Sequence, residues 1–244
     1  MRFLTPIATR ARWRGAVNAT TRFYLPSAGA APVTPVFSTG WEDTSIAARL
    51  KTAKTKANTA MTTVSFADLN TTDRDILFRQ WVSGPLSVQT IVAQSITLQM
   101  RGSELSLTNN LFLTWVVKLM SNDGLTERGI LVAIRRDGTE LDTALVNRGD
   151  VATSISITSI DGDRLVFEIG VGGLPLISHD SSLRIGDVDA ADLPRDDTAI
   201  ADNNPWIEFQ QFLLFAAVAV TTRNTRSNPL GVAVGMGWRM PTTA

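Results

Sequence analysis

The sequence predicts an all-β fold: an antiparallel jelly-roll-like β-sandwich with an extended N-terminal arm. From about Met61 onward, apolar and polar residues alternate with a period of two over most segments. Asp-Gly turn signals separate some of these segments, and no helical pattern lies between them. With 244 residues, the chain is long enough for such a sandwich and a substantial core. We therefore divide it into an arm over residues 1–60 and a sandwich over residues 61–244, which includes a C-terminal strand.

The arm region contains little that forms a packed element by itself. Three prolines between residues 26 and 35 fix φ and favour extended backbone at the residues before them. One short helix is possible over residues 42–60, where Ile46, Leu50 and Ala53 share a face. We expect a segment without an interior of its own to become ordered only through contact with other chains.

The sandwich region contains short apolar runs typical of strands. The run over residues 111–124 is apolar on both faces, as in a buried central strand. Asp137-Gly138 predicts a turn, and residues 152–173 predict a hairpin that turns at Asp161-Gly162. The other expected strands lie at residues 61–69, 76–86, 87–105, 128–141, 205–220 and 228–240.

Composition excludes several kinds of chemistry. There is no cysteine, so neither a disulfide nor a thiolate contributes to fold or reaction. The single histidine, His179, lies beside Asp180, and a Ser-His-Asp triad would have to use it; a loop histidine is the expected alternative. The start of the chain lacks the apolar stretch of a secretory signal, and the longest apolar run, residues 212–220, is shorter than the ~20 residues of a membrane helix. We expect a non-enzyme without a membrane segment.

Charge is distributed unevenly along a chain whose net charge is zero. Residues 1–56 carry nine Lys and Arg against Glu42 and Asp43, so this part has a charge of +7 and the rest has −7. Such asymmetry indicates a basic arm on an acidic body.

Six aspartates between Asp187 and Asp202 form the most acidic stretch of the chain. Calcium prefers such oxygen ligands, but the glycine and closing glutamate of the EF-hand pattern are missing. Catalytic acids need a pairing geometry that spacing within a loop does not provide. We favour a solvated or partner-facing loop and expect no cofactor, with structural calcium as a less favoured alternative.

Basic and aromatic residues interleave near the N-terminus. This combination suits either nucleic acid or an acidic protein surface. We favour a protein partner, because the arm is thinly charged for nucleic-acid binding, and the acidic body of a neighbouring copy is one such surface. The predicted partner-binding residues are Arg10, Arg12, Trp13, Arg14, Arg22, Phe23, Tyr24, Phe37 and Trp41.

Tryptophans in the expected strands offer an alternative function. Carbohydrate-binding sandwiches use exposed tryptophans as platforms for sugar rings, so a glycan-binding module has to be considered. Trp115 lies in a run that is apolar on both faces and is expected in the core. Trp81 and Trp206 could be either buried or exposed.

Three segments resemble a recurrent type of tailed-bacteriophage virion protein: residues 22–45 (RFYLPSAGAAPVTPVFSTGWEDTS), residues 76–86 (ILFRQWVSGPL) and residues 183–209 (LRIGDVDAADLPRDDTAIADNNPWIEF). Within them, the blocks Tyr24–Pro26, Gly40–Thr44 and Arg184–Phe209 carry the likeness, without assigned roles. The resemblance implies a β-sandwich with an extended N-terminal segment, located in the virion as a capsid decoration, neck or tail-associated protein. It also implies a homo-oligomer whose partners are other virion proteins and copies of itself.

Overall fold

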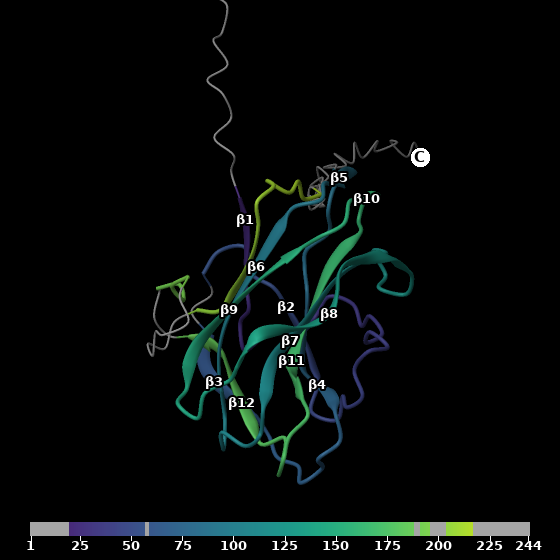
Figure 1. The fold of residues 1–244 in the computed structure, drawn as a ribbon. Helices are drawn as coiled ribbons and strands as arrows, with labels where there is room; N and C mark the ends of the chain where they lie inside the picture. Colours follow the sequence, from purple (N-terminus) through teal and green to yellow (C-terminus); the bar gives the residue numbers. More distant parts are fainter. Residues whose placement is uncertain (1–19, 57–58, 188–190, 196–203, 217–244) are drawn as a thin grey trace, which may run out of the picture.

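The computed structural model describes residues 20–56, 59–187, 191–195 and 204–216 (Figure 1). Every regular element in these residues is a β-strand, and two sheets pack face to face around one apolar core. This confirms the predicted all-β sandwich, whereas its jelly-roll form stays a prediction. Among the residues with a described structure, no helix is long and apolar enough to span a membrane.

The first sheet is built around β6, which has neighbours on both edges. Strand β9 pairs along one edge, while β13 and β12 share the other, with Trp206 opposite Gln99 and Arg184 opposite Arg101. The order is β1-β13-β6-β12-β3, and all pairs are antiparallel. The strands of this sheet are β1 (Thr21–Tyr24), β3 (Thr59–Phe66), β6 (Ser95–Glu104), β9 (Val146–Thr153), β12 (Ser181–Asp187) and β13 (Trp206–Phe209).

The second sheet has the order β2-β4-β11-β7-β8. Its pairs are antiparallel except for β2 and β4, which run parallel. A two-stranded ribbon of β5 (Gln89–Ile91) and β10 (Ile157–Ser159) lies at the upper end in Figure 1. The strands of the second sheet are β2 (Ala48–Lys51), β4 (Arg74–Val82), β7 (Leu111–Met120), β8 (Glu127–Glu140) and β11 (Arg164–Gly173).

Alternation along the strands supplies the core between the sheets. On β7, Leu113, Trp115 and Val117 point inward and are fully buried. The intervening Val116 is also buried, because a further segment covers the outer face of this sheet. Strand β7 is therefore doubly buried, as its sequence predicts, and it lies inside the sheet between β11 and β8.

Residues 31–47 run as an extended segment over the outer face of the second sheet. Trp41 packs there against Leu77 and Val116, and Ala31 and Val33 pack against a cluster formed by Val82, Met120 and Val166. The expectation that this part of the chain lacks an interior of its own is therefore wrong from residue 21 onward. Its apolar side chains pack against its own sheets.

The helix predicted over residues 42–60 is absent from the described part of that range. Residues 48–51 instead form β2, which pairs with the edge of β4, and Leu50 packs against the core. Six threonines between residues 44 and 63 weaken a helix, since β-branched side chains lose χ1 freedom in it. The edge of β4 offers backbone hydrogen bonds to these residues, and pairing with it stabilises a strand.

The hairpin predicted over residues 152–173 is wrong in its pairing. The turn exists, and Gly162 adopts the positive φ of 89° that favours glycine. However, β10 on one side of the turn pairs with β5, whereas β11 on the other side pairs with β4 and β7. Pairing partners far away in the sequence replace the local one.

Two further local predictions were also wrong. Asp137 and Gly138 lie inside β8, at an irregularity where the register against β7 shifts between Phe112 and Thr114. The Asp-Gly pair therefore marks a bulge and not a turn. The long strand expected over residues 87–105 is divided into β5 and β6, which belong to different sheets.

A bulge in β11 depends on a glycine. The register against β4 shifts between Ile169 and Gly170, and a Cβ at position 170 would lie 1.8 Å from the carbonyl oxygen of Ile76. We expect Gly170→Ala to lower the free energy of unfolding by about 3 kcal/mol, the upper range for overpacking. Gly138→Ala is the matched control, because nothing lies within 4 Å of its added Cβ. Urea unfolding measures both, and equal stability of the two variants would contradict this reading.

Candidate functional site

The predicted partner-binding residues fall into three groups. Arg10, Arg12, Trp13 and Arg14 lie outside the described residues. Arg22, Phe23 and Tyr24 form most of β1, inside the sandwich. Phe37 and Trp41 belong to the segment over the second sheet. The described members of the set therefore make contacts within their own chain.

Phe23 is a core residue. Its side chain is fully buried, and its ring lies 5.1 Å from the ring of Phe167 and 5.9 Å from that of Phe209, measured between centroids. These tilted and edge-on arrangements are the favourable ones for aromatic pairs. A side chain in this position joins the two sheets and is not available to a partner.

Arg22 points to the outer face of the first sheet. Its guanidinium forms ion pairs with Asp192 and, at 2.7 Å, with Glu208. It also lies 3.9 Å over the ring of Trp206, and the Tyr24 hydroxyl donates to Asp192 at 3.3 Å. Burial, together with the nearby Asp192 carboxylate, raises the pKa of Tyr24. Arg22 thus attaches the acidic loop to the sheet.

The described part of the Asp187–Asp202 loop acts as a cover. The Trp206 indole donates to the carbonyl of Leu193 at 2.8 Å, and Asp192 also pairs with Lys56 at 3.1 Å. Arg195 pairs with Glu208. No group of three or more candidate metal ligands occurs in the described residues. Of the other five aspartates in this loop, only the backbone of Asp187 is described, and the remaining four lie outside the described residues. Calcium binding by those aspartates stays a prediction.

A buried ion pair holds residues 36–41 on the opposite sheet. Lys118 on β7 and Glu168 on β11 are fully buried, and Lys118 Nζ lies 2.9 Å from Glu168 Oε1. Lys118 also donates to the carbonyl of Val36 at 2.7 Å and to Ser38 Oγ at 3.1 Å. The Trp41 indole donates to Glu168 Oε2 at 2.7 Å. Both charges are satisfied, but only with the covering segment in place.

Further hydrogen bonds extend this network. Gln80 donates to Glu168 Oε1 at 2.9 Å, and the Ser38 amide donates to both carboxylate oxygens. Arg49 donates to Gln80 Oε1 at 3.2 Å, and its guanidinium stacks 3.9 Å over the ring of Phe37. Phe37 and Trp41 therefore have structural partners in this chain.

The tryptophans proposed as sugar platforms are buried. Trp81 is fully buried and donates to the carbonyl of Pro26 at 3.0 Å, and Trp206 is 1% exposed. Trp115 is buried in the core as predicted, and its indole donates to Asp150 at 2.6 Å. Stacking on a sugar needs an open ring face, so the role suggested for Trp81 and Trp206 is corrected. Trp81 belongs to the core between the two sheets, whereas Trp206 lies beneath the described part of the acidic loop, which the sequence pattern does not reveal.

His179 is buried at the lower end of the sandwich. Its Nδ1 lies 2.8 Å from the carbonyl oxygen of Asn70, and its Nε2 lies 3.3 Å from that of Gly173. Burial, with Arg74 nearby, lowers its pKa. Because both ring nitrogens face backbone carbonyls, the ring is not placed to accept a proton from a serine.

A cleft of about 350 Å3 opens near this histidine. Hydroxyl groups of Ser65, Ser103 and Ser182 line it, and the last two share a hydrogen bond of 3.0 Å. Glu104 also lines the cleft, accepting from the Leu111 amide through Oε2 while its Oε1 has no hydrogen-bond partner. The cleft offers hydrogen-bonding groups without a histidine ring nitrogen facing them.

Two carboxyl groups meet behind this cleft. Burial is the main reason that the pKa of Glu104 rises to about 7, and the nearby carboxylate of Glu140 contributes. The buried Oε1 atoms of both residues have no hydrogen-bond partner.

The lower end also exposes a cluster of large aliphatic side chains. Three loops meet there, residues 67–73, 105–110 and 174–180, and we call their surface the lower pole (bottom of Figure 1). Backbone hydrogen bonds join the loops, from Leu105 to Asp180, from Leu176 to Thr108 and from His179 to Asp68. Its aliphatic side chains, which are 51 to 83% exposed, are Leu69, Leu105, Leu107, Leu174, Leu176 and Ile177.

The opposite end carries a second apolar surface, the upper pole. It comprises the β5–β10 ribbon, its flanking turns and residues 210–216, which hydrogen bonds connect through Ser87, Gln89 and Leu214. The side chains exposed there are Val88, Val92, Ile155, Ile160, Phe212 and Leu214. Apolar surface that is gathered on hydrogen-bonded loops is typical of interaction sites.

Sequence reasoning missed both poles. The available signal was the presence of leucines in turn-rich stretches such as GSELSLTNN and GGLPLISHD, where polar residues are the norm. A leucine in such a stretch can equally well lie at the end of a strand, and the strand expected over residues 87–105 includes Leu105. Only the fold shows that loops far apart in sequence meet.

Comparisons with known proteins give little further information. No family model and no curated protein matches the chain. A CocE/NonD family hydrolase from Staphylococcus aureus is 10% identical with a TM-score of 0.41, over 81% of this chain and 36% of that one. Infectious bursal disease virus Gx strain (11%, TM-score 0.24, over 76% and 42%) and the VP2 subviral particle of that virus (12%, TM-score 0.22, over 75% and 43%) are also similar. The chain spans less than half the length of each, and likenesses this weak carry no functional argument.

Removing one member of the buried ion pair should be costly. We expect Lys118→Met to lower the free energy of unfolding by about 3–5 kcal/mol, because Glu168 keeps an uncompensated buried charge. Adding Glu168→Gln should restore part of the loss. Lys56→Met is the control, since its partly exposed pair with Asp192 is worth about 1 kcal/mol or less. Urea unfolding of the four proteins measures this, and similar losses in the two single lysine variants would refute it.

The raised pKa of Glu104 predicts a pH dependence of stability. The folded state holds the proton up to a pH of about 7, whereas the unfolded state releases it near 4.5. The contribution is therefore complete below pH 4.5 and is lost as the pH rises to about 7. Glu104→Gln should flatten this decline in the free energy of unfolding between pH 5 and 8, measured by urea titration followed through tryptophan fluorescence. An unchanged slope would show that Glu104 is not the group responsible.

Proposed function

We propose that this chain is a non-enzymatic structural subunit of a virion, packing on copies of itself and on other virion proteins through its two poles. One observation carries the proposal: the lower pole exposes six large aliphatic side chains on three loops that are hydrogen-bonded to one another. Apolar side chains held in water on preorganised loops favour association. Burying them against a partner contributes a free energy of roughly 25 cal/mol per Å2 of apolar surface, and the preorganised loops lose little conformational freedom on binding.

The internal use of ionisable groups supports a structural role. Lys118 and Glu168 fix a covering segment, Arg22 and Asp192 fix another, and the ring of His179 faces backbone carbonyls. These groups stabilise the sandwich and are not arranged around a cleft. These side chains therefore make the described part of the chain more rigid, as a building block requires.

The resemblance of residues 22–45, 76–86 and 183–209 to tailed-bacteriophage virion proteins supports the more specific proposal. On that basis we propose a capsid decoration, neck or tail-associated position. The glycan-binding alternative has no observation in its favour, since the rings of Trp81 and Trp206 are covered.

Polar substitutions at the lower pole should prevent assembly without unfolding the sandwich. We expect a Leu69→Gln, Leu107→Gln and Leu176→Gln triple variant to lose incorporation into particles, because its apolar contact surface is removed. Leu125→Gln is the matched control: its side chain is 75% exposed, in the β7–β8 turn at the other end of these strands. Immunogold labelling and mass spectrometry of purified particles give the readout.

Two outcomes would contradict the proposed function. The first is absence of the wild-type chain from purified particles. The second is full incorporation of the triple variant, with the Leu125→Gln control incorporated to the same extent.

A further inference from the structure

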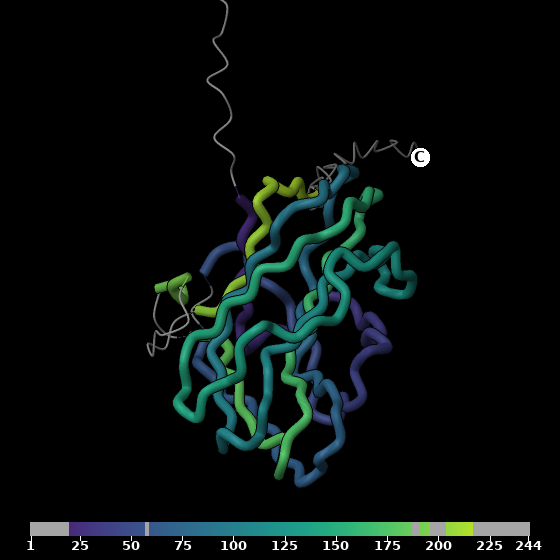
Figure 2. Tube along the Cα trace, viewed as in Figure 1, coloured from purple at the N-terminus to yellow at the C-terminus, as the bar shows by residue number. Residues whose placement is uncertain are grey.

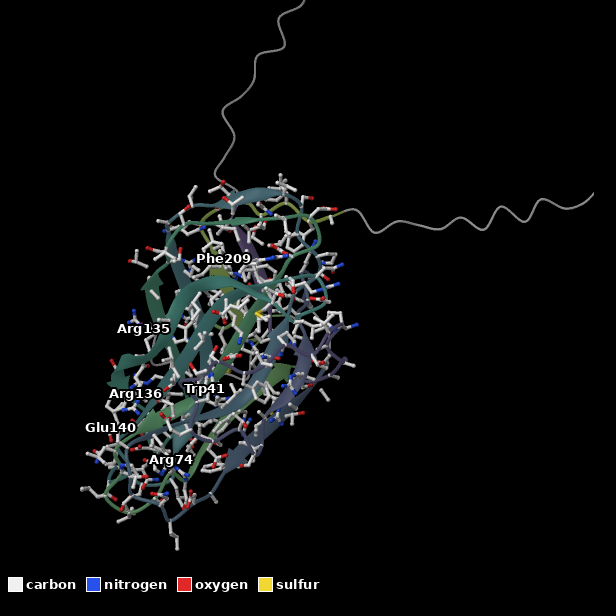
Figure 3. All side chains as sticks on the ribbon, turned by 90° about the vertical axis from the view of Figure 1, so that its right-hand side faces the viewer. Trp41, Arg74, Arg135, Arg136, Glu140 and Phe209 are labelled. Carbon is white, nitrogen blue, oxygen red and sulfur yellow. The ribbon has the colours of Figure 1, made fainter. Side chains whose placement is uncertain are left out.

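The lower pole combines its exposed leucines with an excess of carboxyl groups. Two arginines form ion pairs with these groups: Arg74 pairs with Asp68 and Asp43, and Arg136 pairs with Asp73 and Asp75. Figure 3 shows Arg74, Arg136 and Glu140 toward this end, with Phe209 toward the other. The carboxyl groups of this end include Glu42, Asp43, Asp68, Asp73, Asp75, Asp142 and Asp180.

Several of these carboxylates remain accessible. Asp73 keeps 57% of its side chain exposed although it pairs with Arg136, and Asp142 and Glu42 are also exposed. The pole therefore presents an apolar centre with an acidic rim. A fitting partner needs large apolar side chains interspersed with cations and few or no acidic residues.

One segment of this chain has that composition. Residues 1–19 contain no aspartate or glutamate. They carry four cations, Arg2, Arg10, Arg12 and Arg14, and the large apolar side chains Phe3, Leu4, Ile7, Trp13 and Val17. Arginine and tryptophan are among the residues that contribute most to protein interfaces.

The attachment point of this segment lies at the upper pole. The described chain begins there beside β1, where Thr21 Oγ1 accepts a hydrogen bond of 2.7 Å from the Leu213 amide, and Figure 2 shows both described ends at the top. The ten residues of β6 span the sandwich from pole to pole, which is roughly 33 Å at about 3.3 Å per residue. When two copies stack head to tail, the segment of one copy starts next to the lower pole of the other.

We propose that residues 2–17 of one copy bind the lower pole of a neighbouring copy. The apolar side chains of the segment cover the exposed leucines, and its arginines pair with the acidic rim. This inference rests on the proposed assembly function and adds its direction, since an upper-to-lower contact is heterologous and builds rings or filaments. Binding to the pole of the same chain is disfavoured, because the segment would first have to run back along the sandwich, whose outer faces residues 31–47 and 191–195 already cover in part.

Mixing two full-length variants tests the proposal. The arm variant carries Arg10→Gln, Arg12→Gln, Trp13→Ala and Arg14→Gln, and the pole variant carries Leu69→Gln, Leu107→Gln and Leu176→Gln. Each alone should self-associate at least about tenfold more weakly than the wild type in sedimentation velocity. An equimolar mixture should form heterodimers, because the intact arm of one variant meets the intact pole of the other. A mixture that stays monomeric, or an arm variant that associates like the wild type, would overturn the inference.

A synthetic peptide of residues 1–19 gives an independent readout. Labelled peptide should bind the arm variant, whose pole is intact, at least about tenfold more tightly than the pole variant in fluorescence anisotropy. Affinity should fall with added salt, and a control peptide with glutamine at positions 10, 12 and 14 should bind more weakly. Equal binding to both variants overturns the inference, as does binding to an oligothymidine but not to the pole.

The two proposals fail in distinguishable ways. If particles contain the chain but neither the peptide nor the mixture shows binding, the arm inference is wrong and the structural function stands. If the peptide binds the pole but purified particles lack the chain, the proposed virion function is wrong and the arm inference stands.

Discussion

The structure depends on the compensation of one buried charge pair. Lys118 and Glu168 lie on neighbouring strands, side by side on the face of the second sheet that points away from the core. Charges in such a position are tolerable only with full hydrogen bonding, and Val36, Ser38 and Trp41 supply it. The segment over this sheet is therefore an integral layer of the fold. Without it the ion pair would be incompletely satisfied, and Leu77 and Val116 would be exposed.

On the first sheet, too, a charged side chain attaches a covering segment, but its ion pairs are only partly buried. Arg22, stacked on Trp206 and paired with Asp192 and Glu208, attaches the described part of the acidic loop to the sheet. Covering segments thus occupy part of both outer faces. Apolar surface remains at the two ends, where loops and short ribbons are held by hydrogen bonds to one another. A sandwich covered on its faces and apolar at its poles suits end-to-end association.

The candidate site was only partly predictable. The unequal charge distribution indicated a basic segment and an acidic body, and the inferred contact between copies uses that difference. Of the nine predicted residues, however, the four before residue 20 lie outside the described part of the chain. Among the others, Phe23, Phe37 and Trp41 pack within the chain. Aromatic residues beside arginines look alike in a sequence whether they face a partner or the rest of their own fold. The lower pole was missed because its leucines come from loops that are distant in sequence.

The sequence alone determined the fold class and the interior of the individual strands. The apolar and polar pattern of a strand is a local property, so the fold class followed from period-two alternation, and the burial of β7 and Trp115 followed from a run that is apolar on both faces. Tertiary structure decided which strands pair, because β2 and β10 found partners that no local pattern specifies. It also decided that residues 48–51 form a strand, that Trp81 lies in the core between the sheets, and that Trp206 lies beneath a covering segment. Pairing edges and covered faces arise from contacts between residues far apart in the chain, and these contacts outweigh local preference.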